Sequence, residues 1–316
     1  MAASLHTSLP IGKWAAIEFG SGVIRYSEAD VKDKEITFME EISVDHNLAE
    51  KAKSKQSILG AVDEAISLLF TQLITKAKEQ GVQKISIAAT EIFRSAQDGK
   101  KYIRSLSDHI KHHSGTIGIS IKIISIEEEG KLGYLAIKSS IPTTLSSLSS
   151  SIVVWDAGTG STQMTLFKDG MYHVYKTNGF KRVCDVVNEK NPGSKGDAED
   201  IIANFIKPPS DDQKETFELI RFFPEKMVFR RYSTALEKFF GKDLSELTVD
   251  QMNTEMDQYY QKTSGERDLK IISSIIANLV IMRMFDVPRV PLIKAGIGNT
   301  RGLFLEPSLW DGMSDF

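Results

Sequence analysis

Two glycine-rich segments hold the residues of this chain that could do chemistry. In each segment an apolar stretch ends at an acidic residue, a bend of small residues follows, and a second apolar stretch leaves the bend. The acid is Glu18 in the first segment and Asp156 in the second. Small residues let backbone N–H groups close around an anion, and a carboxylate beside them can hold a divalent cation against that anion. The two segments together predict a clamp for phosphate groups.

The two bends supply the candidate phosphate-binding residues. They are Gly20, Ser21 and Gly22 in the first bend, and Gly158, Thr159, Gly160, Ser161 and Thr162 in the second. Glu18 and Asp156 are the candidate ligands of Mg²⁺, which prefers few carboxylates together with water and phosphate oxygens. A Walker loop and a serine-hydrolase elbow are both missing from the sequence, so it does not favour those two enzyme classes.

The composition is that of an ordinary globular protein. The chain has 316 residues, 41% of them hydrophobic and 26% charged, which is enough for two domains. A net charge of −3 argues against nucleic acid as a partner. Cys184 is the only cysteine, so an intrachain disulfide cannot form. With no apolar run of roughly 18 residues and no signal-peptide core, we expect a cytoplasmic protein without a membrane partner.

Strand and helix patterns organise the chain into two halves. In the first half we expect strands over 14–19, 23–27, 36–42, 84–88 and 119–124, and helices over 58–77, 98–110 and 127–138, with Asp98 as a cap. In the second half we expect strands over 152–156, 162–168, 171–176 and 291–295, with a mostly helical stretch over 198–285. A Ser/Thr-rich connector separates the halves. We therefore predict an N-terminal α/β domain over 1–140 and a helix-rich C-terminal α/β domain over 151–316.

Four motifs in sequence order resemble the exopolyphosphatase / guanosine pentaphosphate phosphatase (Ppx/GppA) family. The family patterns A-x-D-x-G-S-N-S-x-R, A-T-x-x-x-R-x-A, I-S-x-x-E-E-A-R-L-x-Y and D-x-G-G-G-S-T-E are similar to Ala16–Arg25, Ala89–Ala96, Ile124–Tyr134 and Asp156–Gln163. The family belongs to the ribonuclease H-like superfold shared by actin, sugar kinases and heat-shock ATPases. The resemblance therefore implies two related α/β domains with a cleft between them.

The resemblance also implies roles for particular residues. Glu129 would be the base that orients and deprotonates water, and Arg94 would bind phosphate. Gln163 stands where the family has a catalytic glutamate, and Glu18 stands where it has an aspartate. A glycine-rich turn of the family is replaced by Phe229–Thr234. The alternative to a catalytic role for Glu129 is that residues 127–129 are exposed acids in the first turn of a helix, without a function in catalysis.

These features lead to two hypotheses of different class. The first is a Mg²⁺-dependent hydrolase that removes terminal phosphate from inorganic polyphosphate or guanosine pentaphosphate. The second is a phosphate- or nucleotide-binding regulatory module that keeps the clamp and has weakened catalysis, which Glu18 and Gln163 favour. A sugar or acetate kinase is a third reading, and it would require an adenosine pocket near Gly296–Gly302. A homodimer is a candidate assembly.

Overall fold

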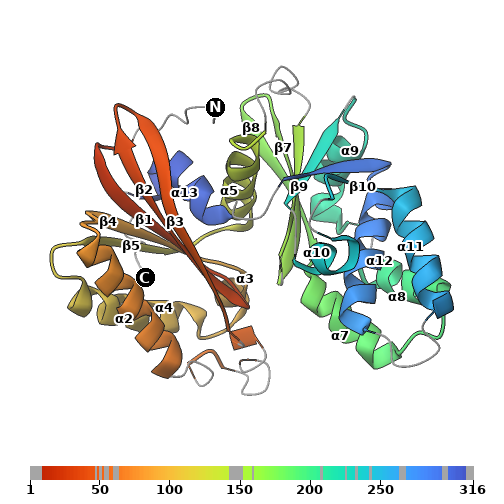
Figure 1. Ribbon diagram of the computed structural model, residues 1–316, viewed down its shortest axis with the longest axis horizontal. Helices are drawn as coiled ribbons and strands as arrows, with labels where there is room; N and C mark the ends of the chain where they lie inside the picture. Colours follow the sequence, from red (N-terminus) through yellow and green to blue (C-terminus); the bar gives the residue numbers. More distant parts are fainter. Residues whose placement is uncertain are drawn as a thin grey trace. The chain divides into compact units, whose positions relative to one another are not determined.

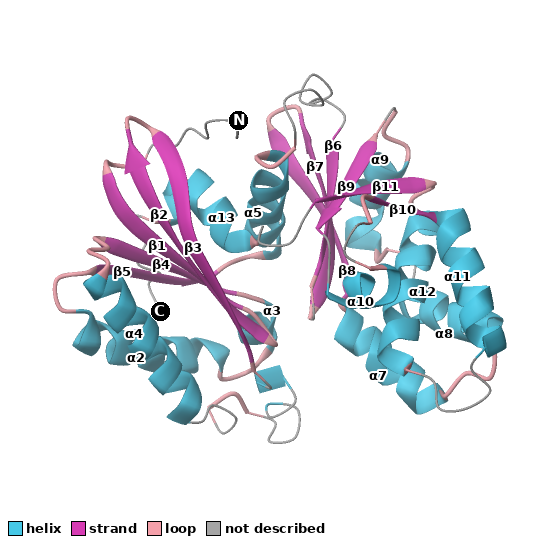
Figure 2. Ribbon diagram, in the orientation of Figure 1, coloured by secondary structure: helices cyan, strands magenta, loops and turns pink. Residues whose placement is uncertain are grey.

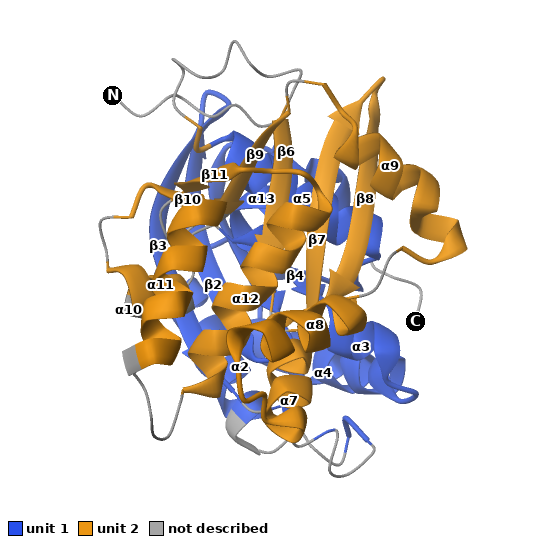
Figure 3. Cartoon of the chain, turned by 90° about the vertical axis from the view of Figure 1, so that its right-hand side faces the viewer, with its two compact units in different colours: residues 1–139, 298–316 blue, residues 140–297 orange. Residues whose placement is uncertain are grey.

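The computed structural model describes residues 9–46, 48–49, 52, 57–59, 64–141, 152–158, 160–206, 209–224, 226–231, 234–241, 244–262, 268–293 and 298–310. The chain divides into two compact units (Figure 3). Unit 1 comprises Met1–Ser139 together with Gly298–Phe316, and unit 2 comprises Ser140–Ile297. The sequence assigned all of 151–316 to the second domain, whereas the C-terminal segment folds with unit 1. None of the helices in the described ranges is long and apolar enough to cross a membrane.

Unit 1 is built on a five-stranded sheet in the order β3-β2-β1-β4-β5 (Figures 1 and 2). The strands are β1 Gly12–Phe19, β2 Val23–Lys32, β3 Glu35–Asp45, β4 Lys84–Ala89 and β5 Gly118–Ile123. β1, β2 and β3 form an antiparallel meander, and β1, β4 and β5 are parallel. The carboxyl ends of the three parallel strands therefore meet at one edge of the sheet.

The alternation of side chains along β1 gives unit 1 two separate cores. Ala15, Ile17 and Phe19 pack with apolar residues of helices α2 (Glu64–Glu79) and α4 (Gly99–Ser114). Trp14 and Ala16 point to the other face, where they pack with residues of α5 (Ile126–Lys138) and α13 (Asn299–Leu305). A strand that is apolar on both faces is typical of the centre of a covered sheet.

The C-terminal segment is fastened to unit 1 by close packing. A Cβ atom on Gly302 would lie 2.2 Å from the carbonyl oxygen of Leu132, so α13 approaches α5 more closely than any other residue type would allow. Trp310 donates from its indole nitrogen to the carbonyl of Leu303 at 2.7 Å, and its ring meets that of Trp14 edge-on at 5.0 Å. These contacts explain why residues 298–310 pack with unit 1 and not with unit 2, which precedes them in the sequence.

Unit 2 repeats the five-strand order of unit 1, read from β8 to β11, and adds β10 at the edge. Its sheet runs β10-β11-β9-β6-β7-β8, with β6 Ile152–Ala157, β7 Ser161–Lys168, β8 Met171–Asn178, β9 Met227–Arg231, β10 Glu246–Thr248 and β11 Arg289–Ile293. β6 pairs antiparallel with β7 and parallel with β9, as β1 does with β2 and β4. This shared order confirms the predicted class of two related ribonuclease H-like α/β domains.

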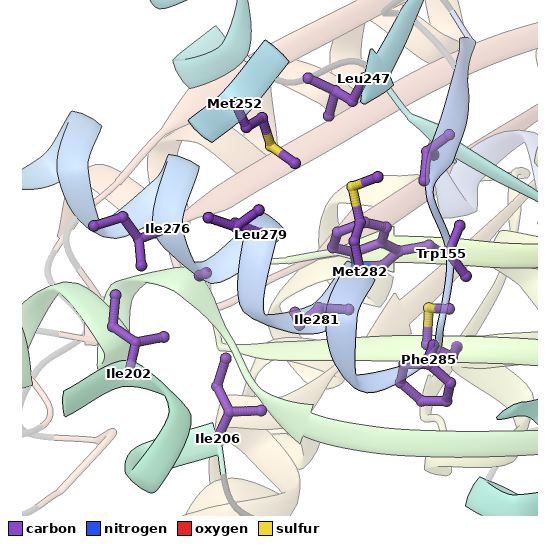
Figure 4. Close-up of a cluster of buried hydrophobic side chains, with 14 of the residues drawn as sticks. Trp155, Ile202, Ile206, Leu247, Met252, Ile276, Leu279, Ile281, Met282 and Phe285 are labelled. Carbon is purple, nitrogen blue, oxygen red and sulfur yellow. The ribbon is translucent and has the colours of Figure 1, made fainter. Parts of the chain in front are cut away.

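Helices cover the core of unit 2. They are α7 Phe180–Lys190, α8 Lys195–Ile206, α9 Lys214–Arg221, α10 Thr234–Phe240, α11 Val249–Lys262 and α12 Leu269–Met284. Figure 4 shows Ile276 and Phe285 in the same buried cluster as Trp155 of β6 and Ile202 of α8. The core therefore lies on the face of the sheet that carries Trp155, and Asp156 belongs to the opposite face.

Three sequence expectations need correction at the level of elements. Residues 198–285 are mostly helical, as expected, but they also include strands β9 and β10, which are too short to show a periodic pattern. The helix expected from Ile58 begins at Glu64, and Ile58 itself lies in a bend. Asp98 precedes α4 without capping it, because its carboxylate accepts hydrogen bonds from Ser57 and from the backbone of residues 58 and 59.

Candidate functional site

The two glycine bends close in the same way. The backbone N–H of Gly20 donates to the carbonyl of Val23 at 3.0 Å, and that of Gly158 donates to the carbonyl of Ser161 at 2.9 Å. A Cβ atom on either glycine would lie 3.0 or 2.8 Å from that same carbonyl oxygen, respectively, which explains the choice of residue. The sequence analysis predicted that both glycines bind phosphate. In the structure their backbone N–H groups instead form the hydrogen bonds that close the bends. Thr159 lies outside the described residues.

The segment after β3 supports the first bend. The N–H of His46 donates to the carbonyl of Gly22 at 2.8 Å, and the N–H of Ala49 donates to the carbonyl of Ser21 at 3.2 Å. Ser21 is buried, with 8% of its surface exposed. The first bend is therefore fixed by its own closure and by residues more than 20 positions downstream.

Glu18 sits at the end of β1 and is engaged on both carboxylate oxygens. Arg25, directly opposite in the β1–β2 register, donates from Nη1 to Oε2 at 2.8 Å. Asn299 of α13 donates from Nδ2 to Oε1 at 3.1 Å, although it is 281 positions away in sequence. The sequence analysis did not identify Asn299 as a site residue. It considered the segment Gly296–Gly302 only for its glycines.

These surroundings do not fit a Mg²⁺ ligand at Glu18. A dication bound to Glu18 would compete with the Arg25 guanidinium for the same carboxylate and would be repelled by it. Among the described residues, no group of three or more His, Cys, Asp or Glu side chains is placed to hold a metal. Of the two predicted ligands, Asp156 is the better candidate.

The three consecutive acids at the start of α5 have three different environments. Glu127 is exposed, and Glu128 forms a capping box with Ser125. Glu128 Oε1 also accepts from Lys122 Nζ at 2.6 Å. Glu129 alone points into the molecule, with 7% of its surface exposed. The reading of residues 127–129 as one exposed acidic face is therefore wrong for Glu129.

Arg94 is the partner of Glu129. Its Nη2 atom donates to Glu129 Oε2 at 2.6 Å and to Glu91 Oε2 at 3.1 Å, and its Nη1 atom donates to the carbonyl of Ile124 at 2.7 Å. The guanidinium thus joins α3 (Glu91–Ser95), the residue after β5 and the first turn of α5. In this arrangement Arg94 positions the predicted base. Glu91 is a further buried carboxylate at the site that the sequence motif did not reveal.

The unit 1 residues gather at one edge of the sheet. Glu18 is paired with Ala88 near the ends of β1 and β4, and Thr90, just beyond β4, donates from its N–H to the carbonyl of Phe19 at 3.1 Å. Arg94 and Glu129 follow the ends of β4 and β5. Sites in α/β sheets form at the carboxyl ends of parallel strands, because loops leave the sheet there.

The second bend places its predicted residues on neighbouring strands. Asp156 lies opposite Gln163 in the β6–β7 register. Gln163 is 1% exposed and donates from Nε2 to Ser161 Oγ at 2.7 Å. The N–H groups of Gly179 and Phe180 donate to the carbonyls of Gly160 and Gly158, which ties the bend to the start of α7. Thr162 is buried beside Gln163.

Arg230 occupies the place where the family has its glycine-rich turn. It lies in β9 and is wholly buried, and its guanidinium carbon is 4.8 Å from the centre of the Trp155 ring and 5.5 Å from that of Phe180. This departure from the family therefore fills the core of unit 2 with a large cation behind the second bend. Tyr232 and Ser233 lie outside the described residues.

The fold and these bends define the class of the protein. Two sheets that share an order of five strands, each with an acid and a glycine bend after its first strand, are the architecture of the actin and sugar-kinase superfold. Residues 27–178 match the model of the Ppx/GppA phosphatase family. The chain is therefore similar to the Ppx/GppA family over residues 27–178, and solved structures share its fold over most of its length.

Solved structures of the same fold cover nearly the whole chain. A Ppx/GppA family member from Aquifex aeolicus is 19% identical, with a TM-score of 0.65, over 95% of this chain and 98% of that chain. An exopolyphosphatase from Cytophaga hutchinsonii is 13% identical, with a TM-score of 0.69, over 94% of this chain and 98% of that chain. At these identities the likeness establishes the fold alone. Among curated protein sequences, none matches this chain closely.

Proposed function

We propose that the chain is a phosphoanhydride hydrolase that releases the terminal phosphate of inorganic polyphosphate or guanosine pentaphosphate. The observation that carries this proposal is the pair of buried Glu129 and half-buried Arg94, 2.6 Å apart at the carboxyl edge of the unit 1 sheet. Glu129 stands at the position of the base in the family motif. A buried carboxylate held by a guanidinium in one orientation is suited to accept the proton of an attacking water.

The remaining requirements are donors and positive charge around the phosphoryl group. The bend at Gly158–Thr162 supplies small residues and hydroxyls, and Asp156 is the carboxylate that would hold Mg²⁺ together with phosphate oxygens. A bound Mg²⁺ would neutralise charge that develops on the transferred phosphoryl group. The proposal requires both bends to meet one ligand in the predicted cleft, which stays a prediction, as do the cytoplasmic location and the homodimer.

The regulatory module is retained as a second candidate because of two observations. Arg94 already binds two carboxylates and a carbonyl, so a phosphate group would have to displace one of them. Gln163 cannot take a proton from water, and it is bonded to Ser161. Both features would permit binding of a phosphate chain with slow turnover.

Phosphate release distinguishes the two candidates. The purified chain is incubated with polyphosphates of graded length and with guanosine pentaphosphate, with and without Mg²⁺. Glu129→Gln should abolish most release while substrate affinity changes little, because it removes the proton acceptor and keeps the shape. Glu127→Gln is the matched control, two residues earlier in the same helix and exposed, and should behave as the parent does. Equal rates for Glu129→Gln and the parent would exclude this assignment, and binding without release in the parent would favour the module.

A further inference from the structure

The core of unit 2 holds three side chains with N–H or O–H donors close to the second bend. Trp155 of β6 and Arg230 of β9 are register partners. Thr162 of β7 is paired with Ala157, which packs against the core. Paired residues point to the same face of a sheet, so all three donors lie on the core face, opposite to Asp156. Trp155, part of the buried cluster in Figure 4, and Thr162 are each 1% exposed, and Arg230 is 0% exposed.

Two of these donors lack an acceptor within the part of the chain that the structure describes. The indole nitrogen of Trp155 and the hydroxyl oxygen of Thr162 are both buried, and neither forms a hydrogen bond with a described residue. Nearly all buried donors in folded proteins are satisfied by protein groups, ordered water or a bound ligand. An indole N–H can only donate, so the group that belongs beside Trp155 is an acceptor.

Arg230 makes the potential at this place positive. Its guanidinium carbon is 4.8 Å from the centre of the Trp155 ring, and stacking on an aromatic ring leaves the charge of the guanidinium intact. Helix α7 begins at Phe180, whose ring is 5.5 Å from the same carbon, and its first turn has no acidic residue. The amino end of the helix dipole therefore adds potential of the same sign. Donors in a positive potential select an anion, and their burial limits it to a small one.

We propose that unit 2 binds a small monovalent anion of the chloride class in its core, behind the second bend. The anion accepts hydrogen bonds from Trp155 Nε1 and Thr162 Oγ1, and it compensates the charge of Arg230. The sheet separates this anion from Asp156 and Gln163, which lie on its other face. The site joins β6, β7 and β9, and it does not depend on the proposed function.

Urea denaturation in sodium chloride and in sodium gluconate of equal ionic strength tests the proposal, because gluconate is too large for an enclosed site. When chloride is present at about ten times its dissociation constant, the unfolding equilibrium constant of the parent should fall by about tenfold relative to gluconate. Sodium bromide should act as chloride does. A general salt effect has the opposite sign, since strongly hydrated anions such as gluconate are excluded from the protein surface and stabilise the folded state.

Variants assign the effect to the named side chains. Trp155→Phe and Thr162→Val each remove one donor and should weaken chloride binding by about tenfold. Arg230→Met should abolish the difference between the two salts. Thr165→Val is the matched control, because Thr165 is also 1% exposed on β7 but points to the opposite face; it should keep the difference found for the parent. The difference between salts is compared for each variant, so a loss of stability common to both salts does not affect the result.

Crystals grown in sodium bromide locate the ion directly. An anomalous peak within hydrogen-bonding distance of Trp155 Nε1 and Thr162 Oγ1 would confirm the site. A water molecule at that place, equal stability of the parent in chloride and gluconate, or an undiminished chloride effect in Arg230→Met would overturn the proposal. None of these measurements uses a substrate, so a chain that hydrolyses nothing can still confirm the anion site.

Discussion

Arg94 Nη2 lies 2.6 Å from Glu129 Oε2, although the two residues are 35 positions apart. The same nitrogen binds Glu91, so one guanidinium neutralises two buried carboxylates at the start of two helices. Each carboxylate side chain is 9% exposed, and the guanidinium is a partner that offsets part of the cost of burying that charge. The predicted catalytic base therefore depends on Arg94 for its place in the fold.

Replacing Arg94 by Met should lower the free energy of unfolding by about 3 to 5 kcal/mol, because two buried carboxylates lose their shared partner. Urea denaturation measures this change. The double variant Arg94→Met/Glu129→Gln should recover part of the loss, since it removes one of the two buried charges that Arg94 contacts in the parent. Arg104→Met, on the exposed face of α4, is the control. A loss below about 1 kcal/mol for Arg94→Met would contradict the coupling inferred here.

Alanine at the two bend glycines should show graded destabilisation. Gly158→Ala brings a Cβ atom to 2.8 Å of the Ser161 carbonyl, and Gly20→Ala brings one to 3.0 Å of the Val23 carbonyl. We expect losses of about 1 to 3 kcal/mol in the free energy of unfolding, larger for Gly158→Ala, because each bend must open to admit the atom. Gly196→Ala, where the nearest atom is 3.8 Å away, should be close to neutral. A larger loss of stability for Gly196→Ala than for the two bend variants would show that the bends can open at little cost in free energy.

The packing of α13 against α5 should not tolerate any side chain at residue 302. Gly302→Ala would place Cβ 2.2 Å from the Leu132 carbonyl oxygen, so α13 must move away from the helix that carries Glu129. We expect a loss of at least about 3 kcal/mol in the free energy of unfolding. Hydrogen exchange should also rise at the backbone of residues 299–305. Parent-like exchange in that segment would mean that the two helices do not depend on this contact.

Asp98 should make stability depend on pH. Burial raises the pKa of its carboxyl, but hydrogen bonds from Ser57 and from the N–H groups of Ile58 and Leu59 outweigh burial and leave the pKa below its ordinary value of 3.8. A lowered pKa in the folded state adds stability that is fully present above that ordinary value and is lost as the pH falls through the folded pKa.

Asp98→Asn should therefore flatten the acid side of the stability curve, measured by urea denaturation from about pH 7 down to about pH 2. Asp108→Asn, an exposed position on the same helix, should keep the parent's curve. If both variants lose stability on acidification as steeply as the parent does, residues 57–59 are not held by this carboxylate.

Restoring the acid of the family motif should raise activity. Gln163→Glu places a carboxylate opposite Asp156, where the Ser161 hydroxyl can turn to donate to it. We expect Mg²⁺-dependent phosphate release to increase by about tenfold, since one well-placed charge near the reacting phosphate is worth about a kcal/mol or more. Gln163→Met, which removes the hydrogen bond and adds no charge, should give no increase. Binding without release by the parent and by Gln163→Glu alike would support the regulatory module.

The sequence by itself determined the features that depend on neighbours along the chain. Alternating apolar residues placed the strands of both meanders, and the Asp169-Gly170 hairpin was confirmed, with both residues at positive φ. The glycine bends and the family motifs were also readable, because small residues at a tight turn answer a local steric demand. From these, the fold class and the family followed.

Tertiary structure alone decided which polar residues meet. The motif at Ile124–Tyr134 singled out Glu129, but the apolar pattern of the helix does not show that Glu129 is buried and Glu127 exposed; the packing of α5 beside Arg94 decides that. Asn299 reaches Glu18 because α13 leaves the second half of the chain and packs on unit 1. Contacts between residues hundreds of positions apart depend on which faces of the helices and sheets are buried against each other. The free energy of that burial is contributed by many side chains, so no short segment of sequence predicts it.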